Sequence, residues 1–492
     1  MRIVRVAHRF EGISQQRERV MTRLEPDLLV IGAGSGGLSV AAGAVQMGAS
    51  VVLLEGGKMG GDCLNYGCVP SKALIAAGNH AHAMTTGAPF GVMPVVPQVD
   101  YAKAKDHVRS VIAGIEPHDS VARFEALGVK VITEYGRFIS QTEVQAGDTI
   151  IKARRVVIAT GSRPFVPPIP GLDAVPYYTN EDIFDLRDKP QHLLIIGGGP
   201  IGIEMAQAHH RLGCKVTVLE GAKALGKDDP EIAAIALEKL RAEGIEIVEG
   251  AMATRIDAQA GKVTVTTKGD ATYSGTHLLM AVGRMPNVEK LDLDKADVVF
   301  ERGGITVDDS LKTTNKRIYA IGDVAGGLQF THVAGYHAGV IIRSALFGLP
   351  SKASTAHIPW ATYIDPEMAQ VGLTEADARD KHGDKLEVLR FDYADNDRAR
   401  AELATTGLIK VMVVKGRPVG ASIVGKQAGE HIQLWSLVIA NKLKIGAVAA
   451  MVSPYPILGE ISKRVAGQYY TPRLFENIWV KRIVGLVQKF GR

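Results

Sequence analysis

Short runs that are apolar at every position mark the strands that the sequence predicts. Runs at 28–31 and 51–54 enclose an alanine-rich helical stretch, and runs at 193–196 and 216–219 enclose a second helical stretch. An uninterrupted apolar run of this length is typical of a strand buried on both faces of a parallel sheet, with the helix as the crossover. The pattern therefore predicts two βαβ units and an α/β fold.

Each predicted unit has a glycine-rich turn between its first strand and its helix. The turn reads GAGSGG from Gly32 and GGGPIG from Gly197, and an acid, Glu55 or Glu220, follows 23 residues after the first glycine. Such a turn holds a pyrophosphate: the first glycine bends the chain, the second lets the phosphates approach, and the third packs helix against strand. These roles fall on Gly32, Gly34 and Gly37 in one unit and on Gly197, Gly199 and Gly202 in the other.

Two such turns predict two bound dinucleotides, and the acids bear on which ones. An acid at this position binds the ribose hydroxyls. Glu220 would repel a 2′-phosphate, so NADH is favoured over NADPH at the second site, although Lys223 and Lys227 lie nearby and soften that preference.

A thiol pair, Cys63 and Cys68, follows the first unit. The residues after it predict a helix over 73–84, with Pro70 suited to the first turn. A thiol at a helix N-terminus has a lowered pKa, because the dipole favours thiolate. The spacing is no zinc pattern and predicts no metal site. We interpret the pair as redox-active, against the alternative of a structural disulfide or two inert thiols.

Composition narrows the class of protein. The chain has 492 residues, 46% hydrophobic and 22% charged, which predicts about three domains. The chain has only three cysteines, which indicates a reducing compartment, and we expect the cytoplasm. Its net charge of +5 is small for this length and gives no reason to expect binding of nucleic acid. No apolar run is long enough to span a membrane. Residues 481–492 read as a basic amphipathic helix, for which solvent is preferred over a membrane surface, and Met21 is a candidate true start.

The segment 60–72, which contains the thiol pair, resembles the active-site signature of the class I pyridine nucleotide–disulfide oxidoreductases, such as dihydrolipoamide dehydrogenase and mercuric reductase. Four further segments resemble that family in the same order, namely 159–162, 281–287, 318–323 and 365–375. The resemblance implies two Rossmann-like domains, for FAD and NAD(P), and a C-terminal α+β dimerisation domain. The implied divisions are an extension (1–24), the FAD domain (25–170 and 290–350), the NAD(P) domain (171–289) and the interface domain (351–492).

The resemblance also implies roles for individual residues. Cys63 is the thiol that meets the substrate, and Cys68 faces the flavin. Lys72 and Glu204 form a pair near the flavin, and in a homodimer Tyr455 and Glu460 of the second chain face Cys63. Besides the first glycine turn, Glu55 and Lys72, the residues implied to bind FAD are Gly61, Gly136, Thr160, Gly161, Gly322, Asp323 and Thr331. Gly283 joins the second turn and Glu220 in binding NAD.

Two residues depart from the family pattern. Tyr455 stands where the family has the histidine that handles the proton of thiol exchange, and a phenol with a pKa near 10 is a poor base. Asp62 replaces the usual threonine, and its charge would raise the pKa of a neighbouring thiol. We expect an FAD-dependent NAD(P)H oxidoreductase acting on a disulfide or dithiol. The alternatives are reduction of a metal ion or another small-molecule acceptor, and a redox-sensing flavoprotein.

Overall fold

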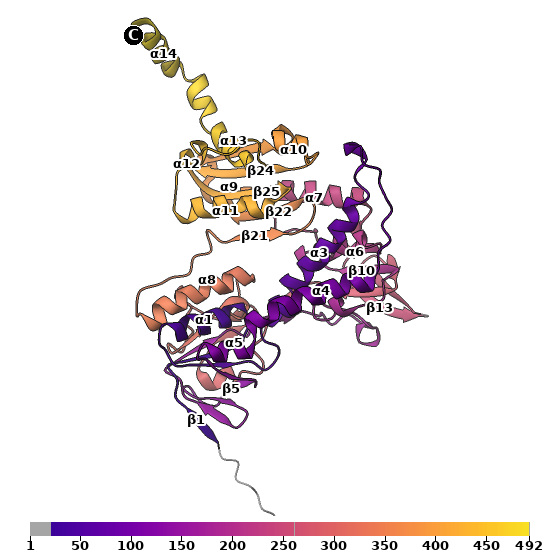
Figure 1. Cartoon of the computed structure of the whole chain (residues 1–492), viewed down its shortest axis with the longest axis vertical. Helices are drawn as coiled ribbons and strands as arrows, with labels where there is room; N and C mark the ends of the chain where they lie inside the picture. The colour runs from indigo at the N-terminus through magenta and orange to yellow at the C-terminus, as the bar shows by residue number, and fades with distance from the viewer. Residues whose placement is uncertain (1–20, 260, 492) are drawn as a thin grey trace, which may run out of the picture.

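Two parallel-sheet units and a C-terminal antiparallel unit make up the molecule (Figure 1). The computed structural model describes residues 21–259 and 261–491. The prediction that the native chain starts at Met21 bears on residues 1–20, which lie outside the described residues. No helix in these two ranges is long and apolar enough to cross a membrane. The architecture confirms the predicted α/β fold with a separate C-terminal α+β domain.

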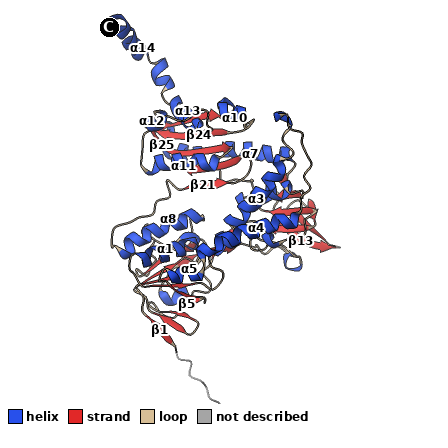
Figure 2. Ribbon diagram, in the orientation of Figure 1, coloured by secondary structure: helices blue, strands red, loops and turns tan. Residues whose placement is uncertain are grey.

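The first parallel sheet has five strands in the order β20-β8-β2-β3-β4. Its strands β2 (Leu28–Ile31) and β3 (Val51–Leu54) have the predicted bounds, and α1 (Ser35–Gln46) connects them. Helix α8 (Thr331–Ile341) packs beside α1 (Figure 2). The other strands are β4 (Lys130–Ile132), β8 (Arg155–Ile158) and β20 (Ile318–Ala320). All four pairings are parallel, so a strand from far along the chain completes this sheet.

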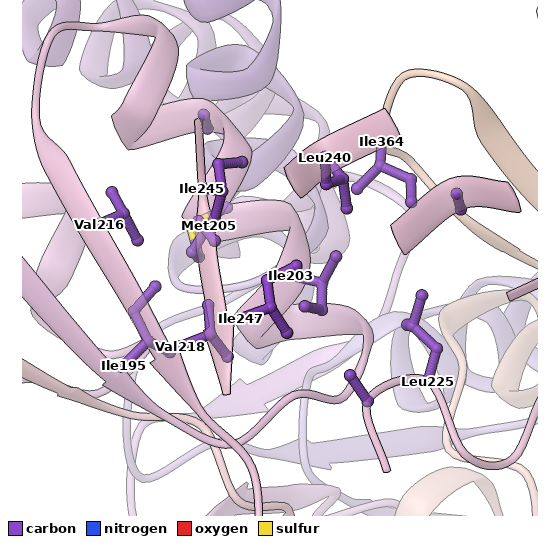
Figure 3. Close-up of a cluster of buried hydrophobic side chains, with 14 of the residues drawn as sticks. Ile195, Ile203, Met205, Val216, Val218, Leu225, Leu240, Ile245, Ile247 and Ile364 are labelled. Carbon is purple, nitrogen blue, oxygen red and sulfur yellow. The ribbon is translucent and has the colours of Figure 1, made fainter. Parts of the chain in front are cut away.

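The second parallel sheet has the order β12-β11-β10-β16. Its helices α6 (Pro200–Arg211) and α7 (Pro230–Glu243) follow β10 and β11 as crossovers. The strands are β10 (His192–Ile196), β11 (Lys215–Leu219), β12 (Glu246–Val248) and β16 (His277–Met280). Figure 3 shows the core of this unit, where Met205 of α6 packs against apolar side chains of the strands.

Smaller strands join these units. One sheet has the order β1-β7-β6-β5, a second is β13-β14-β15, and two pairs are β17-β9 and β18-β19. Their bounds are β1 Thr22–Leu24, β5 Gly136–Phe138, β6 Val144–Ala146, β7 Thr149–Ile151, β9 Ser162–Pro164, β13 Ala253–Gln259, β14 Lys262–Thr267, β15 Thr272–Gly275, β17 Arg284–Pro286, β18 Phe300–Glu301 and β19 Gly304–Ile305. Strand β1 pairs with β7, so residues 22–24, which the sequence assigns to the extension, lie in a sheet.

The C-terminal unit is one antiparallel sheet, β21-β22-β25-β24-β23, with helices packed on it. Its strands are β21 Pro359–Thr362, β22 Glu367–Gly372, β23 Leu386–Asp392, β24 Leu408–Val414 and β25 Arg417–Gly425. The helices that pack on it are α9 Glu375–His382, α10 Asp397–Ala401, α11 Ala428–Ala440, α12 Ile445–Ala449 and α13 Glu460–Gln468. Helix α14 (Ile478–Phe490) follows them and has no buried residue. The fully buried Trp435 of α11 lies in the core between helix and sheet.

The helix that carries the thiol pair's second member lies between the two parallel-sheet units. Helix α3 (Cys68–Ala83) packs against both α4 (Tyr101–Ile115) and α6. It begins at Cys68, five residues earlier than the predicted 73–84. Gly67 is the non-helical N-cap residue before it, and Pro70 is tolerated in the first turn because no helical hydrogen bond needs its missing N–H. Two short helices complete the inventory of this part, α2 Gly61–Asn65 and α5 Val121–Ala126. The earlier start places Cys68 itself at the helix N-terminus.

A buried lysine in α4 makes stability depend on pH. Lys105 is completely buried, its ammonium donates to the carbonyl of Ile183 at 3.0 Å, and burial lowers its pKa from 10.5 to about 7. Between these values the unfolded chain holds a proton that the folded chain lacks, so stability rises with pH across this window. We expect Lys105→Met to stabilise the protein by about 2 kcal/mol below pH 7, with the gain shrinking towards pH 10. Thermal unfolding at several pH values measures it.

The control for this prediction is Lys103→Met, which removes an exposed lysine from the same helix. Surface substitutions of this kind change stability by about 0.5 kcal/mol or less. An equal effect of the two substitutions, or a gain in Lys105→Met that does not vary with pH, would contradict the account.

Candidate functional site

The two glycine-rich turns have the same backbone geometry. Gly32 has φ +106° and Gly197 has φ +115°, and a Cβ at either would lie 2.3 to 2.4 Å from a carbonyl oxygen of the neighbouring strand's end. A Cβ at Gly37 or Gly202 would lie 1.8 to 2.0 Å from the carbonyl oxygen of the first glycine of its own turn. Glycine is therefore required at the bend and at the helix–strand contact of both units.

The middle glycine of each turn faces open space. A Cβ on Gly199 would meet nothing within 4 Å, and one on Gly34 only the Cα of Gly61, at 4.0 Å. Helices α1 and α6 begin beside these glycines, so their free N–H groups point to the same space. Open backbone at a helix N-terminus suits a pyrophosphate.

The acids of the two units also correspond. Glu55 accepts hydrogen bonds from the backbone N–H groups of Ala33 and Gly57, both at 2.7 Å. Glu220 accepts from the N–H of Gly198 at 2.7 Å and of Ala222 at 2.8 Å. Each carboxylate is thereby fixed at the edge of its turn, where a ribose next to the pyrophosphate would lie.

One continuous cavity of about 2090 Å³ connects the two glycine-rich turns, the two thiols and the strand pair β9–β17. Pockets for single drug-sized ligands hold roughly 300–1,000 Å³, so this space suits two dinucleotides rather than one small ligand. The predicted site residues line it except Gly37 and Gly202, which pack against the first glycine of their turns, and Tyr455 and Glu460. The open middle glycines and the two fixed acids fit one dinucleotide at each turn, as the prediction of FAD at the first turn and a nicotinamide dinucleotide at the second requires.

The thiols lie together on the cavity wall. Cys63 lies in α2 and Cys68 is the first residue of α3, and both are free thiols that hydrogen bond to each other. Cys68 Sγ also lies 3.3 Å from the hydroxyl oxygen of Thr331. The hydrogen bond from Cys63, with help from Thr331 and Lys72, lowers the pKa of Cys68 to about 6 although burial opposes it. The same bond, together with burial, raises the pKa of Cys63 well above its usual range. Cys68, at the N-terminus of α3, is therefore the more acidic thiol of the pair.

An ion pair joins the thiol helix to the second unit. Lys72 of α3 donates to Glu204 of α6 at 2.8 Å, and Glu204 also accepts from the backbone N–H of Tyr363 at 2.9 Å. The Lys72 ammonium lies 4.4 Å from the centre of the Tyr363 ring. Both residues line the cavity. The positive charge of Lys72 lowers the pKa of Cys68.

Asp62 faces an arginine, which its position before Cys63 did not reveal. Its carboxylate lies 3.1 Å from Arg284 and accepts from the side-chain amide of Asn180 at 3.0 Å. The Asp62 charge raises the pKa of the second thiol, Cys68, by less than the effects of Cys63, burial, Thr331 and Lys72. Arg284 in turn donates to the hydroxyl of Ser162 at 2.7 Å. Asp62 therefore links the thiol loop to the strand pair β9–β17.

Most of the remaining predicted FAD contacts gather around this strand pair. Asp323 accepts from the Ser162 hydroxyl at 2.6 Å, and burial raises its pKa. The Thr160 hydroxyl donates to the carbonyl of Asn287 at 2.8 Å. The other predicted residues on the cavity wall are Gly61, Gly136, Gly161, Gly283 and Gly322.

Tyr455 and Glu460 lie apart from the thiols within one chain. The Tyr455 side chain is 70% exposed, its hydroxyl donates to Asp397 at 3.0 Å, and this hydrogen bond raises its pKa. Glu460 begins α13 and pairs with Arg464 at 2.9 Å. Neither lines the cavity, so their contact with Cys63 of a second chain stays a prediction.

Sequence reasoning missed Tyr363 and gave Arg284 no role. Arg284 lies within a segment that resembles the family, so its motif was a usable signal. Tyr363 follows β21 in the C-terminal unit and is far in sequence from Lys72, whose ammonium lies against its ring. No local sequence pattern predicts this contact. Among residues 21–259 and 261–491, no group of three or more histidine, cysteine or acidic side chains is placed to hold a metal ion.

Comparison with known proteins agrees with this geometry. Residues 26–338 match the family described as pyridine nucleotide-disulphide oxidoreductase, and residues 358–466 match its dimerisation domain. A mercuric reductase from Bacillus cereus is 35% identical over 88% of this chain and 70% of its own length. A dihydrolipoyl dehydrogenase from Geobacillus stearothermophilus is 33% identical over 90% of this chain and 96% of its own.

Solved structures include similar proteins as well. The Cu(II) complex of the HOCl-induced flavoprotein disulfide reductase RclA from Escherichia coli has a TM-score of 0.81 and 29% identity, covering 90% of this chain and 99% of that one. These relatives share one scaffold but differ in the acceptor that their names imply, so the acceptor has to be argued from the site.

Proposed function

Since the chain belongs to the pyridine nucleotide-disulphide oxidoreductase family, whose members use FAD and NAD(P)H, we propose that it carries electrons from NADH to Cys63 and Cys68, and from them to an acceptor that is not a disulfide. The asymmetry of the thiol pair carries this proposal: Cys68 begins α3 and lies 3.3 Å from the Thr331 hydroxyl, and it is the more acidic thiol, whereas the Cys68 neighbour and burial raise the pKa of Cys63. Bound FAD would supply the conversion of hydride from the nicotinamide into electrons for the thiols.

The chain's own residues divide this work. The turns at Gly32 and Gly197 hold the two pyrophosphates, and Glu220, fixed by two backbone N–H groups, selects NADH by repelling a 2′-phosphate. Lys72, paired with Glu204, holds positive charge beside Cys68 on the cavity wall, where it would also lie near the flavin if FAD binds at the first turn. In a homodimer, which the dimerisation domain supports, Tyr455 and Glu460 would come from the second chain.

The protonation of Cys63 decides between acceptors. To attack a disulfide, Cys63 must lose its proton to a base, because only the thiolate is nucleophilic. Tyr455 cannot serve as that base at neutral pH, because the hydrogen bond to Asp397 raises its pKa and keeps the phenol protonated. A thiophilic metal ion removes this need, because a coordinating thiol is deprotonated by the ion's own charge. We infer that the acceptor is a thiophilic metal ion or a comparable soft electrophile, as the substrate.

A disulfide acceptor is the second candidate, and the thiol pair itself favours it. Cys63 and Cys68 are close enough to hydrogen bond, so Cys68 can displace a substrate sulfur from Cys63 and form the internal disulfide. A dihydrolipoyl dehydrogenase is also among the relatives at 33% identity. This candidate requires another source of the base that Tyr455 does not supply.

Tyr455→His distinguishes the two candidates. We expect the wild type to oxidise NADH slowly with lipoamide and faster with Hg(II) or Cu(II) ions, under anaerobic conditions. The histidine should raise the lipoamide rate at least about tenfold, because a positioned general base contributes roughly 10²–10⁴-fold. The control Tyr455→Phe, which removes only the hydroxyl, should leave the lipoamide rate low. A high wild-type lipoamide rate that histidine does not increase would reject the metal-ion proposal.

A further inference from the structure

The C-terminal helix α14 (Ile478–Phe490) stands away from the rest of the molecule with its apolar side chains uncovered. Figures 1 and 2 show it leading outward from the C-terminal unit. None of its residues is buried, and Trp479 and Phe490 are 66% and 73% exposed. The match to the dimerisation domain ends at residue 466, so the helix lies beyond the matched segment.

The helix is strongly amphipathic. At 3.6 residues per turn its apolar side chains, apart from Ile478, fill about 160° of the circumference. These side chains are Trp479, Val480, Ile483, Val484, Leu486, Val487 and Phe490. The opposite face carries Lys481, Arg482 and Lys489, and residues 477–491 contain no acid. Two of the cations lie at the border between the faces, Arg482 at 5.0 Å from the Trp479 ring and Lys489 at 5.4 Å from the Phe490 ring.

The base of the helix is held to the domain. Arg473, in the turn before α14, pairs with both carboxylate oxygens of Glu387 at 2.8 Å and stacks 3.6 Å from the centre of the Tyr469 ring. Leu474 and Phe475 beside it are also exposed. The apolar surface therefore continues from this anchored turn onto the helix.

We propose that α14 binds in the plane of a lipid bilayer with anionic headgroups and holds the enzyme at the membrane surface. A wide apolar arc with tryptophan and phenylalanine, opposed by a face whose charges are all positive, is the pattern of an interfacial helix. The basic residues at the border extend their charges to the headgroups while their stems lie along the apolar side. An anionic surface is favoured over a second copy of the helix, because a second copy would bring no acid to pair with these cations, whereas anionic headgroups neutralise them.

Vesicle binding by the full-length holoenzyme tests the proposal. We expect co-sedimentation with vesicles of phosphatidylglycerol and phosphatidylcholine to be roughly 100-fold stronger than with phosphatidylcholine alone, because each basic residue near an anionic surface adds about fivefold. Added salt should weaken it. Ile483→Glu places a charge in the apolar arc, and Gln488→Glu places the same charge on the polar face. Glutamate is a good helix former, so both variants keep the helix.

Ile483→Glu should lower binding to the anionic vesicles at least about tenfold more than Gln488→Glu does, since only it removes apolar burial. NADH oxidation should be unchanged in both, which separates this result from the fate of the proposed function. Equal loss in the two variants, or no binding to anionic vesicles, overturns the proposal. A change in particle mass caused by Ile483→Glu in the absence of lipid also overturns it, because the helix then joins copies of the chain.

Discussion

Replacing Cys63 by serine is expected to abolish NADH oxidation by the acceptor, lowering the anaerobic rate at least about a thousandfold, because serine can neither bind a soft acceptor as thiolate nor form a disulfide with Cys68. The structure shows why the loss should be confined to this step. Cys68 keeps Thr331 and Lys72 as partners, and the cofactor turns are untouched. Bleaching of the bound flavin by NADH should therefore persist in the variant.

The matched control is Cys214→Ser, which changes the third cysteine in the same way. Cys214 is buried away from the cavity, and burial raises its pKa to about 11, so it is an inert thiol. Its serine variant should retain the wild-type rate with some loss of stability. A Cys63→Ser enzyme that still reduces the acceptor at the wild-type rate would show that electrons leave without passing through the thiol pair, and the proposed function would fail.

The features predicted best from the sequence are those with strictly local causes. The strands at 28–31 and 51–54 were predicted with their observed bounds, since a fully apolar run and a glycine turn are both visible in a short window. Because the two glycine-rich turns have similar sequences, they were expected to have the same backbone geometry. Gly32 and Gly197 indeed both have a positive φ, and at both a Cβ would collide with a carbonyl oxygen. Local patterns therefore sufficed for the fold and for both dinucleotide turns.

What the sequence could not supply depends on contacts between distant segments. Asp62 was recognised as unusual, but its partner Arg284 lies more than two hundred residues away, across the strand pair β9–β17. The lowered pKa of Cys68 likewise depends in part on Thr331, brought in by α8. The predicted contact of Tyr455 and Glu460 with Cys63 involves a second chain, so a single chain leaves it a prediction.

The largest effect on stability is expected from a buried charge cluster that joins the second parallel-sheet unit to the C-terminal unit. Lys410 of β24 is 2% exposed, and its ammonium lies 2.9 Å from Asp229, 2.9 Å from Glu231 and 2.8 Å from Glu375. Asp229 is itself buried and caps α7. Although burial opposes it, the hydrogen bonds with these three carboxylates raise the pKa of Lys410, so it remains charged.

Lys410→Met is therefore expected to destabilise the protein by about 3–5 kcal/mol, because it leaves Asp229 as a buried charge without its cation. By the scaling for domains of about 150–250 residues, the apparent melting temperature should fall by roughly 6–20 °C. Lys426→Met is the matched control, since Lys426 pairs with Glu402 at 2.7 Å on the exposed surface of the same domain, where such pairs contribute about 1 kcal/mol or less. If both substitutions lowered the melting temperature equally, the carboxylates around Lys410 would be solvated, and the cluster would not be what fixes the C-terminal unit to α7.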